Sequence, residues 1–184
     1  MVTIDVRSRD SFESLAVRLR EKPIINDAEV LAGPEPAGIT ALIVRQGYRP
    51  GPVIRDLIMR LAGEDQEDIR VAIVPRIPRH ADGTVDGPAA WAVLDEKALV
   101  LRFEPPATEI ERRLADLVRQ VLPRVGVSMT DDLVSLGGDS LVAVELVELI
   151  AEQWGAQISG RDLFAAETIR DMAAVIARAI SSPT

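Results

Sequence analysis

The stretch Asp132-Leu-Val-Ser-Leu-Gly-Gly-Asp-Ser-Leu141 decides how the second half of this chain folds. Ser140 follows directly on Gly-Gly-Asp, and apolar residues recur at helical spacing from Leu141 to Trp154. The pattern predicts a loop that opens into a helix with a hydroxyl group in its first turn. Because the N-terminus of a helix carries free N–H groups and partial positive charge, a phosphate attached to Ser140 would be favoured there.

Three further helices are predicted around this one. Thr108 and Glu111 form a capping box at the start of an apolar stripe that Pro123 ends. A short helix is expected over Ser159–Phe164, and Thr168 with Asp171 caps the last. The expected fold of residues 107–181 is therefore an all-α four-helix bundle with a long first loop.

The Gly-Gly-Asp-Ser-Leu motif and this helix order resemble the thiolation domains, or peptidyl carrier proteins, of nonribosomal peptide synthetases. In that family the serine of the motif carries a covalent 4′-phosphopantetheine arm derived from coenzyme A. The resemblance covers all of 107–181 and implies that Ser140 carries the arm, with Gly138, Asp139 and Leu141 beside it. The double glycine favours the peptidyl type over fatty-acid and polyketide carriers.

The resemblance also implies the partners of this region. A phosphopantetheinyl transferase would load the arm and would supply the magnesium ion and the base. An adenylating enzyme acting in trans, and condensation, tailoring or thioesterase enzymes, would then act on the tethered group. No catalytic residue or metal site is expected in the chain itself. The residues expected to contact partners are Leu141, Val144, Leu163 and Phe164.

The first half of the chain reads as a small α+β unit, a mixed sheet with flanking helices, over residues 1–90. The expected elements follow the order strand, helix, strand, strand, helix, strand. Alternation and turn residues place them at 2–6, 12–21, 28–32, 39–44, 53–61 and 69–73.

This unit resembles the C-terminal subdomain of adenylation domains. Ile77-Pro78 and Gly83-Thr84-Val85-Asp86 resemble the last core motif of that family, but Thr84 stands where the catalytic lysine is found. A threonine hydroxyl cannot supply positive charge to a phosphoryl centre, and the large ATP-binding subdomain is also missing from the sequence. We therefore expect a non-catalytic docking platform. The alternative is a complementary fragment of a split adenylation enzyme.

Residues 91–106 are expected to form a linker or an added hairpin. Trp91–Leu94 and Ala98–Phe103 are the candidate strands, with Asp95-Glu96-Lys97 between them. Pro105-Pro106 marks the boundary with the carrier-like region.

Composition excludes several other classes of protein. The net charge of −8 argues against a nucleic-acid partner, and no cysteine is present for disulfides or thiol chemistry. The N-terminus lacks a signal-peptide pattern, and no apolar run is long enough to span a membrane. A cytoplasmic location is the expectation.

Two other interpretations of Ser140 stay open. Gly-Asp-Ser-Leu is also the nucleophile motif of a lipase and esterase family, but that chemistry needs a base, and the only histidine is His80. Ser140 would otherwise be only a helix cap in an interaction module that is never modified, although the capping role is expected chiefly of Asp139.

Overall fold

The computed structural model describes residues 9–32, 39–62, 69–123 and 126–181. The chain divides into two compact units, Met1–Phe103 (the N-terminal unit) and Glu104–Thr184 (the C-terminal unit). The strand expected at 2–6 lies outside the described residues.

The N-terminal unit is built on a mixed sheet of four strands in the order β1-β2-β3-β4. These strands are β1 (Ile25–Ala32), β2 (Ile39–Arg45), β3 (Ile69–Ile73) and β4 (Leu99–Leu101). β1 and β4 run antiparallel to their neighbours, whereas β2 and β3 are parallel. The small mixed sheet expected from the sequence is confirmed.

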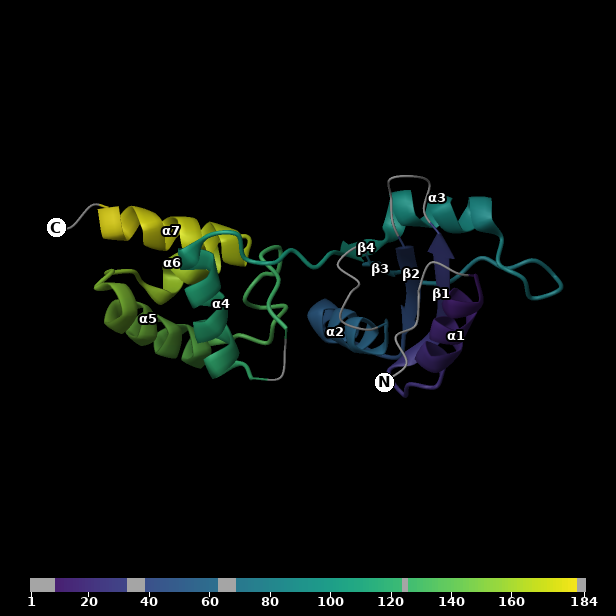
Figure 1. The fold of residues 1–184 in the computed structure, drawn as a ribbon, viewed down its shortest axis with the longest axis horizontal. Helices are drawn as coiled ribbons and strands as arrows, with labels where there is room; N and C mark the ends of the chain where they lie inside the picture. Colours follow the sequence, from purple (N-terminus) through teal and green to yellow (C-terminus); the bar gives the residue numbers. More distant parts are fainter. Residues whose placement is uncertain (1–8, 33–38, 63–68, 124–125, 182–184) are drawn as a thin grey trace. The chain divides into compact units, whose positions relative to one another are not determined.

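Helices cover both faces of this sheet (Figure 1). Helices α1 (Arg9–Arg20) and α2 (Gly51–Ala62) pack on one face, and α2 is the crossover that parallel strands require. Helix α3 (Gly87–Lys97) covers the opposite face. The two sets of core residues alternate along β2, because successive side chains of a strand point to opposite faces.

Helix α3 corrects the expected hairpin, since Trp91–Leu94 is helical and only Leu99–Leu101 is a strand. The carboxylate of Asp86 accepts a hydrogen bond from the Ala89 N–H at 3.1 Å, and a proline occupies the first turn. Both features favour a helix start. The apolar residues at 91–94 are therefore part of an alanine-rich helix rather than a strand.

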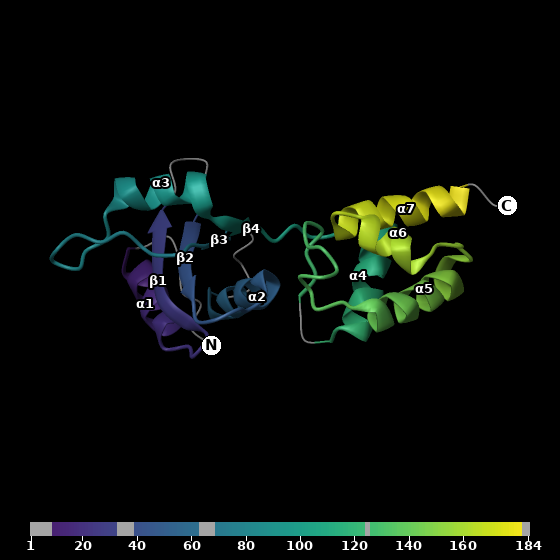
Figure 2. The ribbon, with the colours of Figure 1, turned by 180° about the vertical axis from the view of Figure 1, so that it is seen from behind.

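The C-terminal unit consists of four described helices around one apolar core. They are α4 (Glu109–Val121), α5 (Ser140–Trp154), α6 (Gly160–Ala165) and α7 (Ile169–Ser181). The capping box of Thr108 and Glu111 is present, and α6 has a second one. Figures 1 and 2 show α6 between α5 and α7, both of which it contacts. The four expected helices are thus all present.

The loop between α4 and α5 is part of this core rather than a surface excursion. Its apolar residues are almost fully buried: Val127, Met129, Leu133 and Leu136. The backbone also binds α7, since the Ile169 and Arg170 N–H groups donate to the carbonyls of Asp131 and Met129. The path of the chain towards α5 is fixed by these contacts.

In the part of the chain that the structure describes, every helix is too short or too polar to cross a membrane.

Glu111 predicts a pH dependence of folding. Burial raises the pKa of this carboxyl. The hydrogen bonds from the amides of Thr108 and Ala107 and the Arg170 guanidinium lower the pKa by more than burial raises it, so the net pKa lies below its usual value. A depressed pKa stabilises the fold above the unfolded-state value of about 4.3 and loses that contribution as pH falls through the folded-state pKa. We expect Glu111→Gln to lower the free energy of unfolding at pH 7 by about 1–3 kcal/mol. Its stability should fall less steeply between pH 5 and pH 3 than that of the wild type.

Urea unfolding at a series of pH values measures this difference. Glu145→Gln is the control, because Glu145 is an exposed carboxyl on α5 that takes no part in the contacts of Glu111. Equal pH slopes in the wild type and Glu111→Gln would contradict the assignment.

Candidate functional site

Ser140 is the first residue of α5 and is exposed. The preceding residue, Asp139, is the N-cap: its Oδ1 accepts hydrogen bonds from the N–H groups of Leu141 at 2.9 Å and Val142 at 3.0 Å. The capping role expected for Asp139 is confirmed. Because these donors are satisfied by Asp139, the Ser140 hydroxyl is not needed as a cap and is available to solvent.

The two glycines before Asp139 are required by the loop itself. Gly137 has φ +97°, a backbone conformation that residues with a side chain rarely adopt. A Cβ on Gly138 would lie 2.5 Å from Leu133 Cγ and 2.7 Å from the Leu133 carbonyl oxygen. The fold of the loop therefore needs both glycines: Gly137 for its backbone conformation, and Gly138 because the loop passes directly over buried Leu133.

Apolar side chains are exposed on α5 and α6 of the same unit as this turn. Leu141 is 74% exposed, Val144 55% and Phe164 42%. Val134, which was not predicted from the sequence, is 66% exposed in the loop before Ser140. The sequence did offer a signal for its exposure: Leu133 and Leu136 are three residues apart, and Val134 does not fall on that spacing.

Leu163 corrects the expected set of contact residues. It is fully buried and belongs to the core that the four helices share. Leu163 and Phe164 are adjacent on a one-and-a-half-turn helix, so they point in different directions, and only Phe164 reaches the surface. The sequence alone did not show which of the two faced inward.

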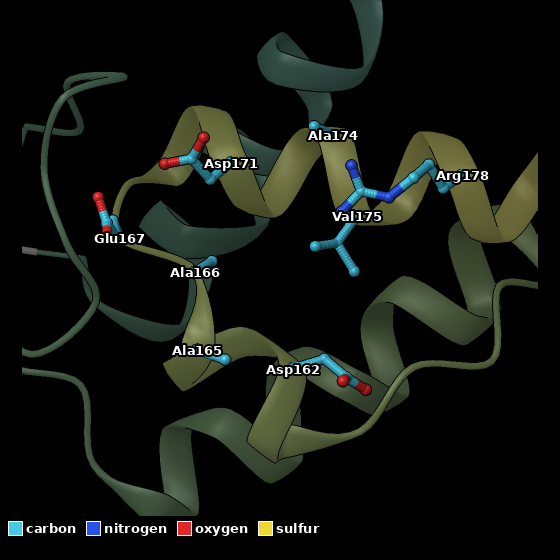
Figure 3. Close-up of a pocket in the computed structure, with 8 residues that line it drawn as sticks. All are labelled: Asp162, Ala165, Ala166, Glu167, Asp171, Ala174, Val175 and Arg178. Carbon is cyan, nitrogen blue, oxygen red and sulfur yellow. The ribbon is translucent and has the colours of Figure 1, made fainter.

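A hollow of about 390 Å³ lies between α6 and α7 (Figure 3). Its wall includes Ala165, Ala166 and Ala174. Two of its three carboxylates already serve helix starts, since Asp162 accepts from Ser159 and Asp171 from Thr168; the third belongs to Glu167. Ser140 is not among its lining residues, so this hollow is not part of the site.

Thr84 lies in a braced loop of the N-terminal unit. Its hydroxyl donates to Asp82 Oδ1 at 2.6 Å, which lowers the pKa of that carboxyl. The guanidinium of Arg79 binds Asp27 and Glu29 on β1, and this ties the loop to the sheet. Thr84 also lines a groove of about 790 Å³ whose other lining residues include Phe12 and Val17. Position 84 therefore presents an uncharged hydroxyl on a fixed loop.

Comparisons with known proteins bear on the C-terminal unit. Residues 112–176 match the family described as phosphopantetheine attachment site. The antimetabolite synthetase AmbE of Pseudomonas aeruginosa is 32% identical over 108 residues, which is 59% of this chain and 5% of that protein. A linear gramicidin synthase of Brevibacillus parabrevis is 29% identical over 170 residues, 88% of this chain and 3% of its own length.

The gramicidin synthase alignment is longer than the C-terminal unit and therefore extends across the N-terminal unit. Among solved structures, a nonribosomal PCP domain is 38% identical, with a TM-score of 0.35, over 39% of this chain and 92% of its own. The chain thus spans only a small part of the two synthetases.

Gly138→Ala tests the packing of the loop before Ser140. The added methyl group would meet the backbone oxygen of Leu133, which cannot move without disturbing the core. We expect a loss of about 1–3 kcal/mol in the free energy of unfolding. Urea denaturation measures it.

Gly160→Ala is the matched control, because its added Cβ would lie 3.6 Å from Ala143 Cβ, an ordinary contact. This change should be neutral, or stabilise by about 0.4–1 kcal/mol. If both variants unfolded at the same urea concentration, the loop would not depend on Gly138.

Proposed function

We propose, on the premise that residues 112–176 are a phosphopantetheine attachment domain, that Ser140 is the residue to which the arm is joined. The observation that carries the assignment is an exposed hydroxyl on the first residue of α5, directly after a fixed glycine loop. Asp139 holds the turn that presents Ser140, and Gly138 lets the loop pass over Leu133. The four helices of this unit are then the four-helix bundle of a peptidyl carrier.

The residues around Ser140 fit a long, flexible covalent group. Leu141 and Val144 offer exposed apolar surface on the same helix, and the positive end of α5 favours the attached phosphate. When attached, the arm supplies a thiol that holds an acyl or aminoacyl group as a thioester. The chain has no cysteine of its own, so this thiol is the only one it would carry.

Attachment is a phosphoryl transfer in which Ser140 is the nucleophile. Its oxygen bonds to the phosphorus that carries the pantetheine, the pyrophosphate bond of coenzyme A breaks, and adenosine 3′,5′-bisphosphate leaves. The serine proton passes to a base of the transferase. Ser140 must therefore be accessible to another protein, which agrees with its exposure.

The carrier works in nonribosomal peptide-type biosynthesis, as its synthetase relatives suggest. Its surface for transferase, adenylating, condensation, tailoring or thioesterase partners includes Leu141, Val144 and Phe164. Val134 joins this set because it is exposed on the loop that leads to Ser140. Leu163 supports that surface from within the core.

The N-terminal unit acts as a docking platform derived from an adenylation subdomain. The groove that contains Thr84 is large enough for side chains of a partner, and the alignment with the gramicidin synthase extends over this unit. Without a lysine, position 84 itself supplies no cation for adenylation. Its contribution is to hold the enzyme that loads the neighbouring carrier.

Mass spectrometry of the intact chain tests the attachment. After incubation with coenzyme A, magnesium and a broad-specificity phosphopantetheinyl transferase, the wild type should gain one phosphopantetheine per chain. Ser140→Ala should gain none.

Ser135→Ala is a matched control, since Ser135 lies in the same loop and caps a turn through its hydroxyl. It should still be modified. A wild-type mass that stays unchanged, or modification of Ser140→Ala, would refute the proposal.

The docking role predicts a kinetic difference between the full chain and its C-terminal unit. Loading by the cognate adenylating enzyme should show a higher KM for a 104–184 fragment than for residues 1–184, with kcat unchanged. The loss of a docking surface weakens binding of both ground and transition states equally.

Phosphopantetheinylation of both proteins is the control and should proceed at equal rates, because the transferase acts on the C-terminal unit. Equal KM values for loading would remove the docking role. ATP–pyrophosphate exchange that required residues 1–103 would instead support the split-enzyme alternative.

A further inference from the structure

The chain is held on both sides of the boundary between its two units. On the N-terminal side, the Leu101 side chain packs against Gly51, and the Arg55 guanidinium lies over the Phe103 ring at 5.7 Å from its centre. Arg55 is fully buried, so this contact fixes Phe103 to the body of its unit. The next residue, Glu104, already belongs to the C-terminal unit.

Glu104 is attached to the C-terminal unit by backbone and side chain together. Its N–H donates to Ser128 Oγ at 2.8 Å, and its carbonyl accepts from the Met129 N–H at 2.9 Å. Its carboxylate receives a hydrogen bond from Arg170 Nη1 at 2.7 Å. Ser128 is itself buried, and its N–H donates to Asp131, so the anchor on this side belongs to the interior of the unit.

Arg170 joins this segment to two helices. It lies in the first turn of α7, and its Nε also donates to Glu111 Oε1 of α4 at 3.2 Å. The amides of Ala107 and Thr108 bind the other oxygen of Glu111, at 2.7 and 2.9 Å. One guanidinium therefore bridges both ends of the segment Glu104–Thr108.

We propose that Arg170 is a latch that holds residues 104–107 on the C-terminal unit and so sets the reach of the carrier. With the latch closed, the two anchored side chains, Phe103 and Glu104, are neighbours in the chain, and the carrier pivots about a very short hinge. With the latch open, residues 104–107 become free connector, which adds up to about 14 Å of contour length.

The freed connector would be an extended, semi-rigid spacer rather than a flexible chain. Pro105 and Pro106 restrict it to extended conformations. The exposed ion pair of Arg170 with Glu104 has side-chain exposures of 45% and 42%, so salt weakens it. Such a pair shifts an opening equilibrium by up to about fivefold, enough to tune the open population without unfolding the unit.

The latch does not depend on the attachment at Ser140, because the unmodified chain carries every one of its contacts. Amide hydrogen exchange of the full chain therefore tests it directly. The reporting amides are the N–H groups of Glu104 and Met129. They form the two backbone hydrogen bonds that hold Glu104 on the C-terminal unit. The amides of Leu114 and Val118 on α4, whose side chains are buried in the core of the C-terminal unit, report on the stability of the unit itself.

Arg170→Ala and Glu104→Gln should each lower the protection of the reporting amides by up to about fivefold, and the core amides of α4 should stay unchanged in Glu104→Gln. Glu104→Gln leaves the Arg170–Glu111 contact in place and so separates the latch from the fold. Arg178→Ala is the matched control, as it removes an exposed arginine from the same helix, and should leave protection at the wild-type level.

The effect on reach is measured with spin labels at Arg60→Cys and Glu148→Cys, one exposed site in each unit of a chain that has no native cysteine. In Arg170→Ala, and in the wild type at 1 M salt, the distance distribution should gain weight at its long end. Wild-type protection in both latch variants, or distributions that superpose on the wild type despite lost protection, would overturn the proposal.

Discussion

The Asp139 carboxylate, which accepts two hydrogen bonds from N–H groups in the first turn of α5, makes the contact on which the candidate site depends. It satisfies the Leu141 and Val142 N–H groups from the residue before the helix. The hydroxyl of Ser140 is therefore not needed to cap the helix. If Ser140 were the cap instead, its oxygen would be occupied in the fold, and modification would compete with folding.

The cap holds its position because the loop before it is packed as core. Leu133 and Leu136 are buried, and Gly138 passes so close to Leu133 that no side chain fits. Loops usually lie on the surface and vary in conformation. Here burial replaces that freedom, so Ser140, at the loop–helix junction, is held in one geometry.

The same strategy of fixing a short segment at several points is found at the start of the C-terminal unit. Glu111 caps α4 and receives Arg170, while Glu104 is held by Ser128 and Arg170. The individual exposed ion pairs are weak, but they act on a segment whose backbone is already bound. A small change in the exposed Arg170–Glu104 pair would therefore affect how the segment opens more than whether the unit folds.

The sequence by itself determined the helix starts of the second half, the motif at Ser140 and the mixed sheet. These features depend on local rules: capping boxes, helical periodicity and strand alternation act over a few residues and are visible without a partner element. The expected helix order of the second half and the cap at Asp139 follow from them. The sequence also showed that Thr84 offers no positive charge.

Only the tertiary structure decided the features that depend on distant contacts. Leu163 and Phe164 are both apolar and adjacent, and the packing of α6 alone sorts one inward and the other outward. Residues 91–94 have an apolar pattern compatible with a strand, and their packing on the sheet face shows them to be helical, although the cap at Asp86 is itself a local signal. The bridge from Arg170 to Glu104 and Glu111 joins residues 66 and 59 positions apart. No pattern of spacing along the chain predicts which charges such a fold brings together.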